Sequence, residues 1–401
     1  MSPVIFHIDV NSAYLSWTAV EQLKNGAEVD LREIPAIIGG DKKSRHGVVL
    51  AKSIAAKKYG IRTGEPVVNA FRKCPNLVME PPDHRMYREK SRKLMEYLRG
   101  FTTKIEQVSV DECYLDFTEI ADRFPSPLDA AFLMKNGIRE WFGFTVNIGI
   151  SENKLLAKMA SDFEKPDKVH TLFLREVPVK MWPLPLGDLF MAGRSSVEAL
   201  KKLEINTIGD LANADLSLIE LHLKSHGKML WEFANGIDHS SVQWEQTEAK
   251  GIGNSTTLAE DAATYEEVRE VFAGLAESVG RRLRKAGQKA NMVSMEIKYH
   301  DFQSMSHQTQ LSKPTSDEQI LLDTACRLFQ EAWTGEPVRL LGLRTAKLVD
   351  AGEPEQMSIF DLEPPGPVDE KRQRLNAAMN QIKEKFGDDA VMKASRMKKV
   401  K

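Results

Sequence analysis

Apolar and polar positions alternate along the chain in patterns that are typical of strands and amphipathic helices. Near the N-terminus, the run PVIFHIDV predicts a strand that ends in a turn at Asn11-Ser12. The segment GVVLAKSIAAKKYG (47–60) predicts a strand that leads into a short helix. VSVDECYLDF and FTVNIGIS predict further strands, and a helix from about Asn153 to Phe163 follows the second. We therefore expect an α+β unit over roughly the first 165 residues.

The pattern changes at VPVKMWPLPLGDL, which contains three prolines between Pro178 and Pro185. Short helical segments separated by glycines follow, as far as about Asp238. The segments LKKLEINTIGDL (200–211) and LKSHGKMLWEFANGID (223–238) fit the pattern of helix-hairpin-helix modules.

A polar joint, HSSVQWEQTEAKG, precedes a third region. KGIGNSTTLA, ANMVSMEIKYH, SMSHQTQLS and PVRLLGLRTAKLV predict four strands. Two helices are expected among them, one from Tyr265 to Ala286 and one from about Asp317 to Trp333. The resulting order β-α-β-β-α-β is a recurring α+β motif. The tail after Asp350 begins with prolines and glycines and carries a predicted amphipathic helix, VDEKRQRLNAAMNQIKEKFG.

The composition indicates a globular protein and argues against several classes. Hydrophobic residues make up 42% and charged residues 28% of the chain. No apolar run reaches the length of a membrane span, and Asp9 interrupts the N-terminal apolar stretch, so we expect neither a span nor a secretion signal. Cys74, Cys113 and Cys326 are widely spaced, which favours a reducing compartment and argues against a thiolate zinc site. With a net charge of −2, any nucleic-acid surface must be a local patch.

Three carboxylates occupy unusual places in the strand-like segments: Asp9, Asp111 and Glu112. Acidic residues are depleted in strands, and buried unpaired charge is costly. If the two strands are neighbours, the carboxylates converge, which requires a cation or a raised pKa. Oxygen ligands suit Mg²⁺, and two such ions clamp the attacking and leaving oxygens in phosphoryl transfer. In the structural alternative, Asp9 and Asp111 cap turns and Glu112 is solvated.

Basic residues form two candidate phosphate-binding groups. In NIGISENKLLAKMASDFEKP, Ser151 can cap a helix that carries Lys154 and Lys158 on one face, and Lys165 follows its end. The alternative is a solvated helix face. The segment GRRLRKAGQK ends a helix and can make sequence-independent phosphate contacts, although cations there also offset the helix dipole. Its basic residues are Arg281, Arg282, Arg284, Lys285 and Lys289.

The segment QMSIF stands in the polar tail and comprises Gln356, Met357, Ser358, Ile359 and Phe360. Short hydrophobic peptides of this kind dock into grooves of partner proteins. In the alternative, the tail folds back onto its own domain.

Six motifs occur in colinear order within about residues 3–362: HIDVNSAY, GIRTGEP, VSVDECYLDF, NIGISENKLLAKMASDFEKP, the hairpin region and QMSIF. Together they resemble the Y-family of translesion DNA polymerases, most closely the bacterial DinB group. The resemblance implies an α+β multidomain, right-hand polymerase with a palm, small fingers, a helical thumb and a β-α-β-β-α-β little finger. The implied divisions are palm 1–10 and 76–166, fingers 11–75, helix-hairpin-helix thumb 167–240, linker 241–250, little finger 251–350 and tail 351–401.

The resemblance also implies roles for individual residues. Asp9, Asp111 and Glu112 match the catalytic, metal-binding carboxylates, with the Val10 carbonyl as a further ligand, and Tyr14 matches the steric gate that excludes a 2′-hydroxyl. The nucleotide-binding positions are Ala13, Tyr14, Lys57 and Lys165. The basic groups described above and the two hairpins GRSSVEALKKL and SHGKML supply the candidate DNA-binding positions: Lys154, Lys158, Gly193, Arg194, Gly227, Lys228, Arg281, Arg282, Arg284 and Lys285. The pentapeptide Gln356 to Phe360 is similar to the clamp-binding peptide of the family.

The implied activity is low-fidelity, template-directed DNA synthesis across damaged bases, with two Mg²⁺ ions as cofactors. The expected partners are primer-template DNA, deoxynucleoside triphosphates and the sliding clamp. The resemblance further implies a monomer in the bacterial cytoplasm, associated with the nucleoid. Two rival hypotheses stay open here: a non-catalytic DNA- and clamp-binding factor, and a nucleotide cyclase or phosphodiesterase-like enzyme built on a palm-type fold.

This sequence departs from the family pattern in the fingers. A hydroxyl residue, a tyrosine and an arginine usually face the triphosphate, whereas Ala51, Ile54 and Lys57 stand at those positions. Asn11 replaces a frequent second aspartate, and the first hairpin reads Gly193-Arg194-Ser195 instead of Gly-x-Gly. AKSIAAKK and DVN look more like the UmuC branch. These changes leave every expected metal ligand in place, but lysine cannot supply the bidentate fork of arginine.

Overall fold

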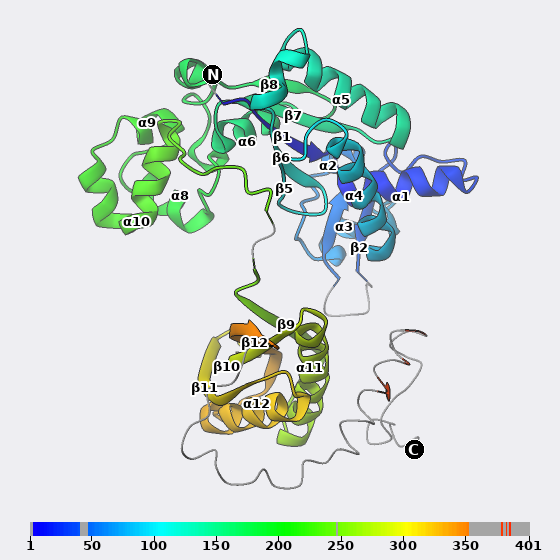
Figure 1. Cartoon of the computed structure of the whole chain (residues 1–401), viewed down its shortest axis with the longest axis vertical. Helices are drawn as coiled ribbons and strands as arrows, with labels where there is room; N and C mark the ends of the chain where they lie inside the picture. Colours follow the sequence, from blue (N-terminus) through cyan, green and yellow to red (C-terminus); the bar gives the residue numbers. More distant parts are fainter. Residues whose placement is uncertain are drawn as a thin grey trace. The chain divides into compact units, whose positions relative to one another are not determined.

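The computed structural model describes residues 3–40, 47–245 and 248–352, together with positions 378, 379, 382 and 385. The chain divides into two compact units, Met1–Thr247 and Glu248–Lys401 (Figure 1). In the part of the chain that the structure describes, no helix combines the length and apolar character needed to cross a membrane.

A five-stranded sheet with the order β5-β6-β1-β7-β8 organises the first unit. β1 pairs antiparallel with both β6 and β7, while β7 and β8 are parallel. The strands are β1 (Ile5–Val10), β5 (Ile105–Gln107), β6 (Glu112–Asp116), β7 (Val146–Ser151) and β8 (Val169–Thr171).

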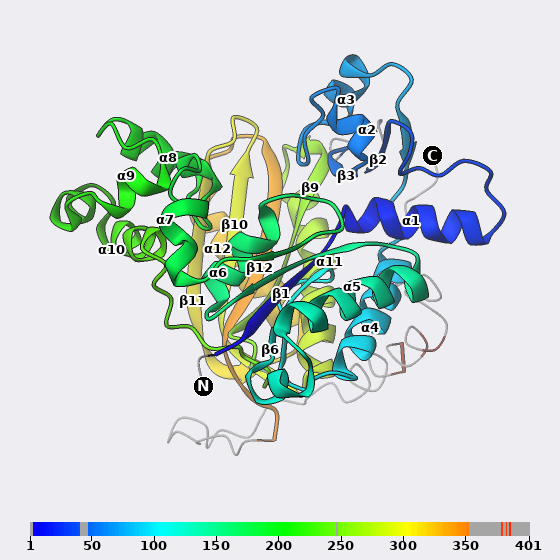
Figure 2. The same cartoon turned by 90° about the horizontal axis from the view of Figure 1, so that it is seen from above.

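The two faces of this sheet differ in character. Apolar side chains such as Phe6, Ile8 and Leu115 share one buried core with residues of helices α4 (His84–Arg99) and α5 (Pro127–Phe142). Helix α6 (Lys154–Asp162) packs against β7 and β1, and Figure 2 shows it apart from α4 and α5. Ser126 caps α5, and Asn153 caps α6 by accepting from the Leu156 amide. A 3₁₀ turn, η1 (Thr118–Arg123), follows β6.

Strands that follow β1 along the chain form a small sheet with the order β3-β2-β4. Ser53 begins helix α2: its hydroxyl accepts from the Ala56 amide and donates to the Ile34 carbonyl, which fixes the helix on β2. The elements are α1 (Ala13–Lys24), β2 (Ala36–Gly39), β3 (Val49–Lys52), α2 (Ile54–Lys57), α3 (Val67–Lys73) and β4 (Val78–Glu80).

Short helices complete the first unit and share one apolar core with helix α6. Lys224, at φ 55° and ψ −140°, breaks α10 into two helices that meet at a hairpin. Gly227 follows this break, and a Cβ there would lie only 2.7 Å from the Ile219 carbonyl oxygen, so the close helix contact requires glycine. The elements are η2 (Leu174–Glu176), α7 (Val177–Lys180), η3 (Leu186–Asp188), α8 (Arg194–Lys201), α9 (Ile208–Ala212) and α10 (Leu216–Ala234).

The second unit is a four-stranded sheet, β11-β10-β12-β9, whose apolar side chains share one core with two helices. The predicted β-α-β-β-α-β order is confirmed. The elements are β9 (Gly251–Ala262), α11 (Tyr265–Lys285), β10 (Gln288–Tyr299), β11 (Ser304–Thr315), α12 (Glu318–Ala332) and β12 (Val338–Asp350).

Two local expectations were wrong. The VSV segment forms no strand, because the Val108 and Ser109 amides both donate to the Glu112 carbonyl and close a tight turn. Ser151 does not cap α6, because it lies fully buried in β7 and its hydroxyl donates to the Leu172 carbonyl.

Candidate active site

The strand order brings the three carboxylates to one end of the sheet. Asp9 on β1 stands directly opposite Glu112 on β6. The Val10 amide donates to the Asp111 carbonyl over 3.0 Å, so Asp111 follows the same edge. Directly opposed residues of antiparallel strands project to the same face. The sequence analysis expected the carboxylates to converge if their two strands are neighbours, and β1 and β6 are neighbours.

Two basic side chains contact the carboxylate of Glu112. Its Oε1 lies 2.7 Å from Nε2 of His7 and 2.6 Å from Nζ of Lys158. The His7 hydrogen bond is the main cause that lowers the pKa of Glu112 to about 2. An ionised carboxylate can only accept, so Nε2 of His7 carries the hydrogen. Burial lowers the pKa of His7 itself, which favours the neutral ring.

Asp111 lacks such a cationic partner among the described residues. The Ser109 hydroxyl donates to its Oδ1 over 2.6 Å. Burial raises the pKa of Asp111, and the neighbouring charges of Asp9 and Glu112 raise it further. Asp9 instead pairs with the Lys165 amine, which also lies 2.8 Å from Asp162.

These oxygen donors fit a divalent cation, because their negative charges crowd together and Asp111 is left uncompensated. Asp9 and Asp111 are the best placed, because both of them line the cavity that opens beside this edge of the sheet. Within the described ranges, no three His, Cys, Asp or Glu side chains form a ready metal-binding group. In this structure Lys165 contacts Asp9, and His7 and Lys158 contact Glu112.

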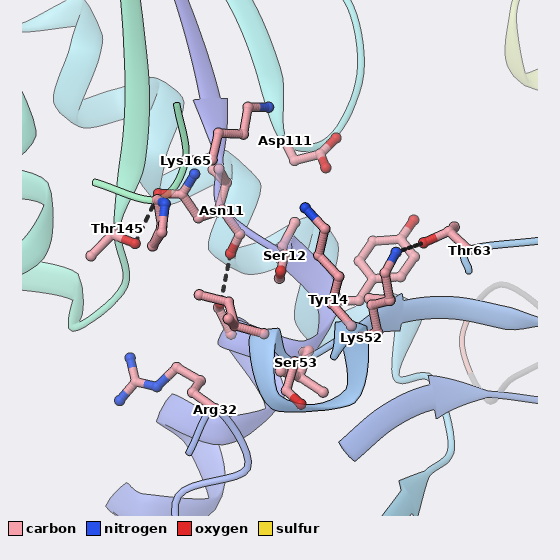
Figure 3. A pocket seen from close by; sticks show the side chains of 18 of the residues that line it. Asn11, Ser12, Tyr14, Arg32, Lys52, Ser53, Thr63, Asp111, Thr145 and Lys165 are labelled. Atoms are coloured by element: carbon pink, nitrogen blue, oxygen red, sulfur yellow. Dashed lines mark hydrogen bonds between the residues drawn. The ribbon is translucent and has the colours of Figure 1, made fainter. Parts of the chain in front are cut away.

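A cavity of about 750 Å³ opens beside the carboxylates (Figure 3). In Figure 3, Lys165 and Asp111 reach it from the side of the large sheet, and Lys52 and Thr63 from the side of the small one. The predicted nucleotide-binding positions all line it: Ala13, Tyr14, Lys57 and Lys165. Asp9, Val10 and Asp111 line it too.

The Tyr14 ring lines this cavity in a fixed position. It stacks on the ring of Tyr87 with centroids 4.3 Å apart and an angle of 8° between the planes. Tyr87 is buried, and its hydroxyl lies 2.9 Å from that of Thr18. The stack therefore fixes the position of Tyr14 from behind.

Sequence reasoning missed several residues that line the cavity, notably Lys52, Thr63 and Arg32. Nζ of Lys52 donates to the Thr63 hydroxyl over 3.2 Å, and burial together with the Lys57 charge lowers the pKa of Lys52. The sequence signal for Lys52 was its place as a basic residue at the end of the predicted strand GVVLAK. Arg32 pairs with Asp30 and donates to the Gly143 carbonyl, and no motif pointed to it.

The three positions at which the sequence departs from the family pattern, Ala51, Ile54 and Lys57, also line the cavity. Ala51 is buried in β3, and Ile54, at the start of α2, is 51% exposed. Lys57 ends the same short helix.

The two lysines of α6 have intramolecular partners. Nζ of Lys154 lies 2.8 Å from Glu106, and Nζ of Lys158 binds Glu112. Each side chain is only 14% exposed, so the solvated-face alternative does not describe them.

The other predicted DNA-binding positions lie elsewhere. Gly193 precedes α8, where Arg194 is exposed and pairs with Glu198, and Lys228 is exposed next to buried Gly227. In the second unit, Arg282 donates to the Gly253 carbonyl and Arg284 pairs with Glu318. Arg281 and Lys285 belong to the same helix end. The pentapeptide Gln356 to Phe360 lies outside the described residues.

Comparisons with known proteins identify the family of this chain. The impB/mucB/samB family pattern matches residues 8–162, and its C-terminal domain pattern matches residues 249–359. The chain is 45% identical to "DNA polymerase IV" of Clostridium acetobutylicum, over 100% of this chain and 99% of that protein. It is 36% identical to "DNA polymerase IV 1" of Bacillus subtilis, over 99% and 94%.

A solved structure shares the fold. The Y-family DNA polymerase chimera Dbh-Dpo4(243-245)-Dbh matches with a TM-score of 0.75 and 20% identity, over 86% of this chain and 99% of that chain. This likeness confirms the polymerase fold that the motifs predicted, and the relatives confirm the family. The chain therefore belongs to the impB/mucB/samB family.

Proposed function

We propose that this chain is a low-fidelity, template-directed DNA polymerase that performs translesion synthesis by nucleotidyl transfer to a primer 3′-hydroxyl. One observation carries the proposal: Asp9 and Asp111 line one cavity with Tyr14, Lys57 and Lys165. That cavity joins acids suited to a divalent cation, lysines suited to phosphates and a ring suited to exclude a 2′-hydroxyl. Relatives that align along their full length carry the name DNA polymerase IV, which supports the same activity.

The domain roles follow from this proposal. We assign the palm to residues 1–10 and 76–166, the fingers to 11–75 and the helix-hairpin-helix thumb to 167–240. The linker is 241–250, the little finger 251–350 and the tail 351–401.

Membership of the family implies dependence on divalent metal ions in general. We propose Mg²⁺, as two ions, held by Asp9, Asp111 and Glu112 with the Val10 carbonyl. When bound, the ions would supply charge neutralisation and activation of the primer hydroxyl.

The chain's own groups then position the substrate. Lys165 and Lys57 hold the phosphates of the incoming nucleotide from opposite sides of the cavity, and Tyr14 stands under its sugar. Most of the rate gain comes from this positioning and from charge stabilisation.

The proposed partners are primer-template DNA, nucleoside triphosphates and a sliding clamp bound through Gln356 to Phe360. For DNA we retain the positions near the hairpins and at the end of α11: Gly193, Arg194, Gly227, Lys228, Arg281, Arg282, Arg284 and Lys285. We leave out Lys154 and Lys158 because both amines pair with carboxylates and both side chains are only 14% exposed. We propose that the protein works as a monomer at the bacterial nucleoid.

Primer extension on undamaged and lesion-containing templates tests the proposal. We expect Mg²⁺-dependent, template-directed insertion on both. A lack of any insertion would favour the non-catalytic DNA- and clamp-binding alternative. The retained carboxylates argue against that alternative, and the hairpin modules argue against a cyclase.

A further inference from the structure

Asn11 links three segments directly behind the carboxylate edge. Its side chain is buried two residues beyond Asp9. Oδ1 accepts from the Thr145 hydroxyl and from the Asp167 amide, both over 2.9 Å. Nδ2 donates to Oδ1 of Asn147 over 3.1 Å. One amide thus ties the end of β1 to β7 and to the loop that follows α6.

Asn147 holds the same loop at both ends. This residue is fully buried in β7. Its Nδ2 donates to the carbonyls of Ser161 and Glu164 over 3.0 Å and 2.7 Å. Its Oδ1 accepts from the Lys168 amide over 3.3 Å. The backbone is therefore fixed on each side of Lys165.

Asp167 anchors the loop from the opposite direction. Its φ of 60° lies in the left-handed region that aspartate tolerates better than most residues. Its carboxylate binds Nζ of Lys135 over 2.8 Å and Nη1 of Arg139 over 2.9 Å, both from α5. The Lys135 side chain is only 6% exposed, so removal of its partner would leave a buried charge uncompensated.

Lys165 lies between these anchors, with its amine against Asp9 and Asp162 at the cavity wall. A lysine has a long flexible stem, so its amine keeps one position only if its backbone is held. We propose that Asn11, Asn147, Asp167 and Lys135 form a positioning network for Lys165, which keeps its amine where the phosphates of the incoming nucleotide bind. This inference rests on the proposed function.

The network also explains why an amide suits position 11. An aspartate there would lose the donor toward Oδ1 of Asn147. It would also add a negative charge close to Asp9 and Asp167. The departure at Asn11 is therefore matched to its surroundings.

The test is a double-mutant cycle on nucleotide binding. The dissociation constant of the correct deoxynucleoside triphosphate is measured on a primer-template that ends in a dideoxynucleotide, so that binding is read without turnover. Lys135→Met and Asn11→Ala are each made alone and in a Lys165→Met background. Lys90→Met is the matched control, because Lys90 is a 13%-exposed helix lysine that pairs with Glu21 over 2.6 Å. Thermal unfolding shows which variants are folded.

We expect Lys135→Met and Asn11→Ala each to weaken nucleotide binding by roughly fivefold, and to have no further effect once Lys165 is Met. Lys90→Met should leave the constant unchanged. Equal weakening in both backgrounds, or no weakening by the folded Lys135→Met variant, would overturn the network. If the unmodified protein binds no nucleotide, the proposed function fails and this inference fails with it. Because Lys135→Met retains the Arg139 pair with Asp167, the test stands even if Asn11→Ala does not fold.

Discussion

Nε2 of His7 lies 2.7 Å from Oε1 of Glu112, beneath the edge where the carboxylates meet. His7 is fully buried, and its Nδ1 lies 2.7 Å from the Ser161 hydroxyl. With Lys158 on the same oxygen, Oε1 is fully engaged and the carboxylate is fixed in orientation. Partners of this kind commonly orient metal-binding carboxylates.

We therefore predict that His7→Phe lowers the kcat of single-nucleotide insertion by about 10- to 100-fold. His7→Gln retains an N–H donor and should lose less. Circular dichroism and thermal unfolding serve as controls for folding, since both changes are in a buried site. An unchanged kcat in folded His7→Phe would show that this hydrogen bond does not orient Glu112.

Tyr14→Ala should open the space under the sugar of the incoming nucleotide. The Tyr14 ring lines the cavity and is held by its stack on Tyr87, so its loss widens the cavity at this point. We expect ribonucleotide insertion relative to deoxynucleotide insertion to rise by at least about tenfold. Tyr14→Phe keeps the ring and should keep the discrimination. Unchanged sugar selectivity in Tyr14→Ala would place the gate elsewhere.

Lys52 should contribute to nucleotide affinity although the usual finger residues are missing. Its amine faces the cavity beside Thr63, whereas Lys58 is exposed and does not line it. Lys52→Met should raise the KM for the incoming nucleotide by about three- to tenfold, and Lys58→Met should not change it. Steady-state insertion assays with both variants compare the two positions. Matching KM values for both would refute a role for Lys52.

Removal of Gln356 to Phe360 should leave basal synthesis intact and abolish stimulation by a sliding clamp. A short apolar motif in a polar tail can supply the anchors for a groove on a partner. The control carries the same five residues in scrambled order. Primer extension with and without the clamp provides the measurement, and equal stimulation of the deleted and full-length proteins would contradict the assignment.

The periodicity of the sequence predicted all four strands and both helices of the second unit, whose apolar side chains share one core. In the first unit it did not single out helices α1, α4 and α5 or strands β2, β4 and β8. It also placed Asp9 at the end of a strand, whereas it expected Asp111 within a strand and Asp111 directly precedes β6. It could not place β1 between β6 and β7, because hydrophobic alternation does not specify which strands pair. The sequence alone could therefore not show that the three carboxylates lie close together.

The sequence also could not predict which side chains contact the site residues, because the partners are far apart along the chain. His7 reads as one polar residue in an apolar run, and its partner Glu112 is 105 positions away. Lys154 and Lys158 share a helix face, but the pattern could not distinguish solvent from the carboxylates of Glu106 and Glu112. Asn11 was noticed only as a departure from the family, although it joins Asn147 and Asp167.

The central claim is that the carboxylates at the ends of β1 and β6 support template-directed nucleotidyl transfer. Its most direct test is Mg²⁺-dependent primer extension by the unmodified protein and by an Asp111→Ala, Glu112→Ala variant shown to be folded. The account predicts that the variant still binds primer-template DNA but loses at least about a thousandfold in insertion rate. Full primer extension by the variant would contradict the account.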